Sequence, residues 1–262
     1  MSPRYLELVC PAGTPAALRA AVDAGADTVY CGFRDCTNAR NYPGLNFDAD
    51  ELREGIAYAH ARGCHVLVAI NTFPPAGNPG PWQRAVDTAA EVGADAVILA
   101  DIGVLDYATR RHPQLRRHLS VQASAANTPS ITFFRDHFDV KRVVLPRVLS
   151  VEEVAGIVAA TGVETEVFAF GSVGPMSEGR CFLSSYLTGL SPASNCTPAT
   201  SLTSTSSASP ESSRIASTSA GVVTSASVES TTCLPDARSR SITSARTAAN
   251  SLSRFEHTTS PR

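Results

Sequence analysis

The feature that most constrains the fold of this chain is a repeated unit. Each unit consists of a short apolar run, a polar turn and an amphipathic segment, and seven units follow one another before residue 171. The apolar runs are almost continuous, which is typical of parallel strands that helices cover on the outside. Seven units of about 25–30 residues favour a TIM-type (β/α) barrel over a doubly wound sheet.

The pattern predicts strands at 6–10, 27–32, 64–70, 94–100, 118–122, 142–146 and 164–170. It predicts helices at 16–24, 49–62, 81–92, 104–111, 128–137 and 150–161. Thr14 followed by Pro15 is typical of an N-cap and a first helical turn, and Ser150 with Glu153 forms a capping box. An eighth unit is not recognisable. We therefore expect an α/β fold, a TIM-type barrel that is incomplete at about seven strands and has two open edges.

The composition changes abruptly after Cys196. Residues 200–262 are dominated by Ser, Thr, Ala and Arg and show neither helical nor strand periodicity. Such a segment buries too little apolar surface to offset its ordering entropy, so we expect a disordered C-terminal tail. It is either a natural low-complexity tail or the product of a shifted reading frame. The frameshift is favoured because the change falls inside an unfinished barrel. The predicted division is a partial barrel over 1–199 and a tail over 200–262.

Charge and hydropathy argue against several classes of function. The formal net charge is −2 with both signs scattered, which gives no basic field for nucleic acid. No apolar run approaches the roughly 18 residues that a membrane span needs, and no signal-peptide core precedes the first strand. We expect a cytoplasmic protein. Its seven cysteines should then be thiols or ligands, with Cys10, Cys31 and Cys64 packed in the core.

Polar side chains follow the C-terminal ends of the predicted strands, which form the active-site face of a barrel. The candidates on this face are Asn38, Arg40, Asn71, Asp101, Gln122, Ser124, Arg147, Glu178 and Arg180. The three arginines are suited to clamp a carboxylate substrate, or they pair with the neighbouring acidic residues. Asn71 and Gln122 either hydrogen-bond a ligand or satisfy loop backbone.

Two cysteines, Cys181 and Cys196, lie in the segment that follows the last predicted strand. Thiolates delivered from such a loop suit a metal or iron–sulfur site. Motifs of hydrolases are missing from the sequence: there is no H-E-x-x-H, no G-x-S-x-G and no placed Cys/His pair. A hydrolytic activity therefore has no support from the residues.

A series of short motifs resembles the collagenase-like U-peptidase family, most closely its UbiU-type branch in ubiquinone biosynthesis. These motifs are CPAG at 10–13, TNAR at 37–40, GLNF at 44–47, AINTF at 69–73, WQRAVD at 82–87, ILAD at 98–101, SVQAS at 120–124, VVLPRVLS at 143–150 and MSEGRC at 176–181. The similarity covers roughly residues 5 to 199. It implies a partial or complete TIM-type barrel.

The resemblance also implies a [4Fe–4S] cluster held by four cysteines. Cys181 and Cys196 match the second and third of them, whereas Gly174 stands where the first belongs. Cys233 lies at about the distance of the fourth, although its neighbours do not match. Glycine has no donor atom, so the implied ligand set is incomplete.

The activity implied by the resemblance is oxygen-independent hydroxylation of a ubiquinone precursor. The chain would act as a heterodimer with a UbiV-like partner, with a small carboxylate such as prephenate as the oxygen source. Related family members hydroxylate tRNA or ribosomal RNA. A collagenase-like peptidase, which rests on the family name, and an inactive fragment are the alternatives.

Overall fold

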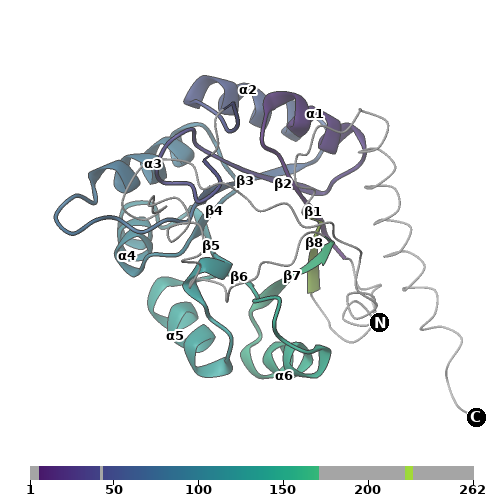
Figure 1. The fold of residues 1–262 in the computed structure, drawn as a ribbon, viewed down its shortest axis with the longest axis vertical. Helices are drawn as coiled ribbons and strands as arrows, with labels where there is room; N and C mark the ends of the chain where they lie inside the picture. Colours follow the sequence, from purple (N-terminus) through teal and green to yellow (C-terminus); the bar gives the residue numbers. More distant parts are fainter. Residues whose placement is uncertain (1–5, 42–43, 171–221, 227–262) are drawn as a thin grey trace, which may run out of the picture.

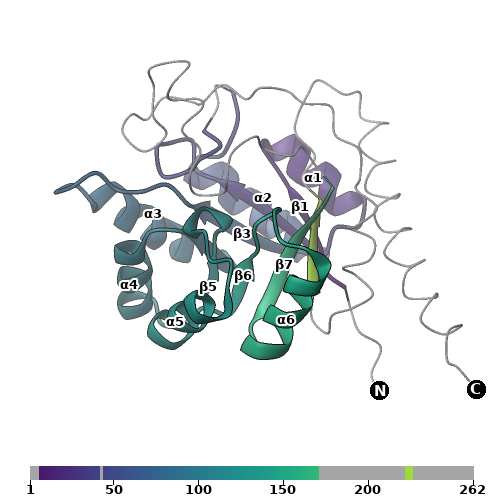
Figure 2. The same cartoon turned by 60° about the horizontal axis from the view of Figure 1, so that its bottom comes forward.

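The computed structural model describes residues 6–41, 44–170 and 222–226. Parallel strands form a closed barrel in chain order, and helices surround it (Figures 1 and 2). The strands are β1 (Leu8–Pro11), β2 (Thr28–Gly32), β3 (His65–Ile70), β4 (Ala96–Leu99), β5 (Arg116–Leu119), β6 (Arg142–Val144), β7 (Glu164–Phe170) and β8 (Val222–Ala226). The helices are α1 (Pro15–Asp23), α2 (Ala49–His60), α3 (Gly80–Glu91), α4 (Ile102–Arg111), α5 (Thr128–Phe138) and α6 (Val151–Thr161).

The predicted alternation of strand and helix is confirmed from β1 to β7. Local signals set several helix ends. Thr14 Oγ1 accepts from the N–H of Ala17 at 3.1 Å, and both hydrogen bonds of the capping box at Ser150 and Glu153 are formed. Strand β5 lies earlier than predicted. The N–H of Gln122 donates to the Ser120 hydroxyl, which begins a 3₁₀ turn in place of further strand.

The expectation of an open, seven-stranded barrel is corrected by β8. This strand pairs in parallel with β7 on one side and with β1 on the other, so that Thr224 lies opposite Val167 and Leu8. Its sequence, VVTSA, begins with β-branched residues that favour strands. The run is short and lies in a Ser/Thr-rich segment, so the composition of that segment did not predict a strand. All other residues beyond 199 lie outside the described part, so the frameshift and the tail's disorder there stay predictions.

Apolar side chains form two cores. The larger one lies between the strands and helices and includes Leu18, Phe47 and Leu105. The smaller one, with Val9 and Ile98, fills the middle of the barrel. Cys10, Cys31 and Cys64 belong to the larger core, as predicted, and no described cysteine forms a disulfide. Among the described helices, none is long and apolar enough to cross a membrane.

Candidate functional site at the C-terminal ends of the strands

The loop after β2 is built around the buried side chain of Asn38. Its Nδ2 donates to Oδ1 of Asn46 at 2.9 Å, and its Oδ1 accepts from the N–H of Arg40 at 2.9 Å. Asn46 donates in turn from Nδ2 to the Arg40 carbonyl at 2.8 Å. Gly32 leaves room for this arrangement, because a Cβ there would lie 2.2 Å from Asn38 Nδ2. Asn38 therefore holds the loop and the backbone that carries Arg40.

Asn71, which follows β3, joins this loop to the end of β5. Its Oδ1 accepts from the N–H of Ala39 at 3.0 Å, and its Nδ2 lies 3.5 Å from the Ser120 hydroxyl, to which it donates. Of the two roles expected for Asn71, these contacts correspond to the satisfaction of loop backbone. A contact with a ligand stays a prediction.

Asp101 and Gln122 follow β4 and β5. Asp101 is the N-cap of α4: its Oδ1 accepts from the N–H groups of Gly103 at 2.9 Å and Val104 at 3.0 Å. Gln122 lies half-buried in the 3₁₀ turn, where its N–H donates to the Ser120 hydroxyl.

Two arginines predicted for this face lie near Tyr30, a residue that sequence reasoning missed. Tyr30 points into the barrel and packs on the smaller core. Burial raises the pKa of Tyr30 to about 12; the charges of Arg40 and Arg147 act to lower it, and the charge of Glu166 acts to raise it. The Arg147 guanidinium lies 3.5 Å from the centre of the Phe168 ring, a cation–π arrangement. The structure thus gathers two cations and a neutral phenol at this end of the barrel.

Several predicted site residues lie outside the described part of the chain. They are Gly174, Glu178, Arg180, Cys181, Cys196 and Cys233. Their roles stay predictions.

The described cysteines do not form a metal site. Burial raises the pKa of the Cys31 thiol to about 12 and that of the Cys64 thiol to about 12, which disfavours the thiolate that metals bind. Within residues 6–41, 44–170 and 222–226, no three His, Cys, Asp or Glu side chains are grouped to hold a metal ion. Any cluster would need the cysteines beyond residue 170.

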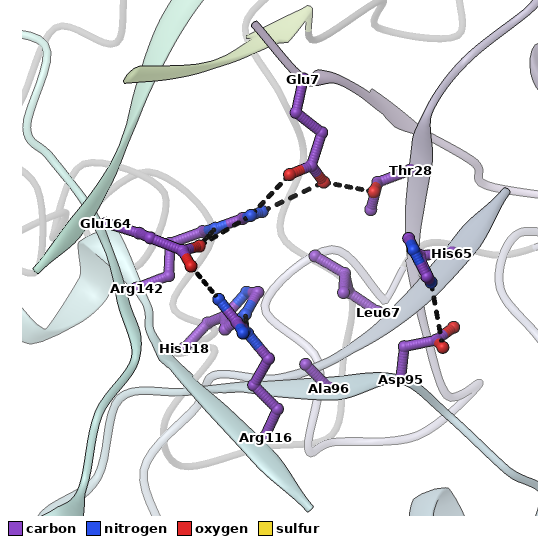
Figure 3. A pocket seen from close by; sticks show the side chains of 10 residues that line it. All are labelled: Glu7, Thr28, His65, Leu67, Asp95, Ala96, Arg116, His118, Arg142 and Glu164. Atoms are coloured by element: carbon purple, nitrogen blue, oxygen red, sulfur yellow. Dashed lines mark hydrogen bonds and ion pairs between the residues drawn. The ribbon is translucent and has the colours of Figure 1, made fainter. Parts of the chain in front are cut away.

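The opposite end of the barrel carries a cavity that the sequence analysis did not predict (Figure 3). Its volume is about 520 Å³. Charged and polar side chains that precede or begin the strands, together with His118 within β5, surround Leu67 and Ala96. They are Glu7, Thr28, His65, Asp95, Arg116, His118, Arg142 and Glu164. We call this space the N-terminal cavity.

Arg142 is the centre of an ion-pair network on one wall of the N-terminal cavity (Figure 3). Its Nη2 donates to Glu7 Oε2 at 2.6 Å and its Nε to Glu164 Oε2 at 3.0 Å. Glu164 Oε1 lies 2.5 Å from Arg116 Nη2, and Thr28 donates its hydroxyl to Glu7. The network joins strands β5, β6 and β7 to the residues that begin the barrel.

Two buried titratable groups lie next to this network. Burial, with a smaller effect of Glu7, raises the pKa of Glu166 to about 7 against the opposing charge of Arg142. Burial also lowers the pKa of His118 well below its usual value, and Arg142 and Arg116 act in the same direction. His118 is therefore neutral, and its Nε2 accepts from Arg116 Nε at 3.0 Å.

The sequence does contain a signal for this network, namely charged residues at strand positions that are apolar in most barrels. Arg116 and His118, like Glu164 and Glu166, stand two residues apart on one strand, so each pair points to the same side. In most barrels the inward positions hold branched apolar residues. Charged residues at alternate positions of a buried strand were the available clue.

Comparison with known proteins identifies the family. Residues 13–225 match Peptidase family U32. The chain belongs to Peptidase family U32. The tRNA hydroxylation protein P of Escherichia coli (strain K12) is 35% identical over 196 residues, which are 74% of this chain and 42% of that protein. An uncharacterized protease of Methanocaldococcus jannaschii is 35% identical over 189 residues, 70% of this chain and 45% of that protein.

A solved structure supports the fold of this U32 chain. The U32 peptidase Mk0906 superposes with a TM-score of 0.61 at 17% identity, covering 88% of this chain and 96% of that one. At this identity the likeness concerns the fold alone. The chain spans less than half the length of these two curated relatives. An activity of the whole relative is therefore a proposal for this chain.

Proposed function

We propose that this chain is the barrel part of a U32 hydroxylation protein that binds a small carboxylate substrate at the C-terminal ends of its strands. The observation that carries the proposal is that the charges of Arg40 and Arg147 both act on Tyr30, while the Arg147 guanidinium lies 3.5 Å from the centre of the Phe168 ring. Two further findings support the proposal: the chain belongs to Peptidase family U32, and it is similar to a protein named as a tRNA hydroxylation protein. The finer proposal is oxygen-independent hydroxylation of a ubiquinone precursor, with a UbiV-like partner and prephenate as the oxygen source.

The charge of the chain supports a small-molecule substrate over RNA. The relative from Escherichia coli acts on tRNA according to its name. Proteins that bind RNA commonly carry a basic surface, whereas this chain has a net charge of −2 and a pI near 6.3. A substrate with one or two carboxylates matches a pair of arginines instead.

The described residues have distinct tasks in this proposal. Arg40 and Arg147 bind the carboxylates of the substrate. Tyr30, whose pKa of about 12 keeps it protonated at neutral pH, donates a hydrogen bond. Asn38 and Asn71 do not contact the substrate in this proposal. They fix the loop that carries Arg40, which binds it.

The family resemblance also implies a [4Fe–4S] cluster. Its implied ligands, Cys181, Cys196 and Cys233, lie beyond the described residues, and Gly174 supplies no donor. The described cysteines do not replace them, because the thiols of Cys31 and Cys64 are buried with raised pKa values. We therefore assign no step of the reaction to a cluster.

Binding of prephenate to the full chain, measured by isothermal titration calorimetry, tests the substrate proposal. Removing a charge-assisted hydrogen-bond donor in Arg147→Gln should weaken binding about tenfold or more. The control, Arg53→Gln, removes an exposed arginine that pairs with Asp50 and should bind as the unaltered chain does. Equal affinities of the two variants, or tighter binding of tRNA than of prephenate by the unaltered chain, would contradict the proposal.

A peptidase is the second candidate, because the family and one relative carry protease names. The buried thiols of Cys31 and Cys64 are unsuited as nucleophiles for the reason given above. Gelatin cleavage that resists metal removal would favour the peptidase. If the chain neither cleaves gelatin nor binds prephenate, an inactive fragment is favoured.

A further inference from the structure

The ion-pair network of the N-terminal cavity contains more carboxylates than it can neutralise. Arg142 is only 7% exposed and faces three of them. Glu7 and Glu164 accept its hydrogen bonds, while Glu166 Oε2 lies 3.9 Å from Nη1. Arg116 is the second cation and pairs with Glu164. Two guanidinium groups therefore face three carboxyl groups.

One carboxylate oxygen of Glu166, Oε2, has no hydrogen-bond partner among the described residues. The Glu166 side chain is 3% exposed. A buried carboxylate that is not hydrogen-bonded is costly, so the group binds a proton in preference to staying ionised. The surplus negative charge is removed when Glu166 is protonated.

Arg142 makes two hydrogen bonds to Glu7, and a charged Glu166 would disturb the longer one. Arg142 Nη1 donates to Glu7 Oε1 at 3.3 Å, compared with 2.6 Å for the bond between Nη2 and Oε2. Glu7 Oε1 also accepts the hydroxyl of Thr28, so it keeps a donor if Nη1 turns away. Nη1 is therefore the group that can change partner.

We propose that Glu166 and Arg142 form a proton-operated latch that holds the start of β1 to β6. When Glu166 is protonated, Arg142 binds Glu7 with two hydrogen bonds and fixes the first strand. When Glu166 loses its proton to solvent, its carboxylate draws Nη1 away from Glu7, and β1 is held less tightly. This proposal does not depend on the proposed function, because it rests on the contacts of Arg142 with Glu7, Glu164 and Glu166.

The groups around Glu166 are consistent with this direction of change. Arg142 on β6 stabilises its charged form, whereas Glu7 ahead of β1 opposes that form. Glu164 lies on the same strand and pairs with both arginines. His118 on β5 is neutral, and Tyr30 on β2 stays protonated in the pH range concerned. Among these groups, Glu166 is the one whose pKa lies near neutral, at about 7.

Hydrogen exchange of the full chain at pH 6 and pH 8 tests the latch, after correction for the intrinsic exchange rate. Protection of the peptide over residues 6–12 should fall about tenfold from pH 6 to pH 8, following the protonated fraction of Glu166. In Glu166→Gln it should be equal at both pH values, and the peptide over α6 serves as the unaffected reference. A pH-independent result in the unaltered chain, or the same fall in Glu166→Gln, would overturn the proposal.

A second measurement uses only the unaltered chain and covers the case in which Glu166→Gln does not fold. Infrared difference spectra with ¹³C-labelled glutamate report the C=O stretch of a protonated glutamic acid. One such band should be present at pH 6 and disappear by pH 8. Absence of the band at pH 6 would overturn the latch.

Discussion

Arg142 on β6 and Glu7, just ahead of β1, are joined by a 2.6 Å hydrogen bond although 135 residues separate them in the chain. The bond crosses the N-terminal end of the barrel and links its first strand to its sixth. Side-chain amides organise the opposite end, where Asn38 and Asn71 fix the loop that carries Arg40. The two ends of this barrel are therefore held by different kinds of interaction.

Replacing Arg142 should destabilise the fold strongly. Arg142→Met leaves Glu7, Glu164 and the buried Glu166 without their shared cation, and breaking a buried ion pair in this way costs about 3–5 kcal/mol of unfolding free energy. The control is Arg110→Met, whose pair with Asp106 is exposed and contributes about 0.5 kcal/mol or less. Urea unfolding at pH 7 compares the two, and similar midpoints would contradict the network's role.

A side chain at Gly32 should disturb the candidate site from a distance. The Cβ of Gly32→Ala would lie 2.2 Å from Asn38 Nδ2, so Asn38 must move and the loop with Arg40 must move with it. We expect a loss of about 1–3 kcal/mol in unfolding free energy and weaker binding of prephenate. Gly156→Ala is the matched control, because its Cβ would meet nothing within 4 Å apart from its chain neighbours and the backbone of its own helix. If both alanine variants bind prephenate alike, Asn38 does not position Arg40.

The stabilising contribution of Asp95 to the unfolding free energy should be lost at acidic pH. Burial alone would raise its pKa, but the Val66 N–H and the imidazoles of His60 and His65 outweigh burial and lower it. A carboxyl with a lowered folded-state pKa stabilises the protein above its unfolded pKa and loses that contribution as pH falls through the folded value. The difference in unfolding free energy between the unaltered chain and Asp95→Asn should therefore shrink between about pH 5 and about pH 3. A constant difference over this range would show that Asp95 is not the cause.

Strand β8 should be required for the barrel although it lies in the segment expected to be a tail. Thr224→Pro removes an N–H from a strand that is paired on both sides and leaves a ladder carbonyl unpaired, which should cost about 1–3 kcal/mol. Thr224→Val, which keeps a β-branched side chain, should have little effect. Thermal unfolding of both variants, and of a chain ending at Ala199, checks this. If the shortened chain is as stable as the full one, β8 is dispensable.

Much of the fold was predictable because strand and helix periodicities agree with local signals along residues 6–170. Thr14 and Ser150 predicted caps that the structure forms. The eighth strand was not predictable, since five residues in a Ser/Thr-rich segment carry too weak a signal for a strand whose stability comes from two neighbours. The fifth strand was displaced because a single hydroxyl, that of Ser120, begins a turn where an apolar run continues.

The candidate site was predictable only in part. Positions after strand ends predicted Asn38, Arg40, Asn71 and Arg147, because parallel strands bring their C-terminal ends to one face. Tyr30 was missed because it lies inside a strand, where an aromatic residue is ordinary. The network around Arg142 was missed because its members lie far apart in the sequence, and only the closed barrel brings them together.

The most direct test of the central claim is the product formed in a strain that lacks its own counterpart of this chain, grown without oxygen. We compare the unaltered chain with a form that carries Gly174→Cys and a reading frame repaired after Ala199, and measure quinones and modified nucleosides by mass spectrometry. The account predicts that the repaired form restores hydroxylated ubiquinone and that the unaltered chain does not. Restoration of a hydroxylated tRNA or ribosomal RNA nucleoside without ubiquinone, or full restoration of ubiquinone by the unaltered chain, would contradict it.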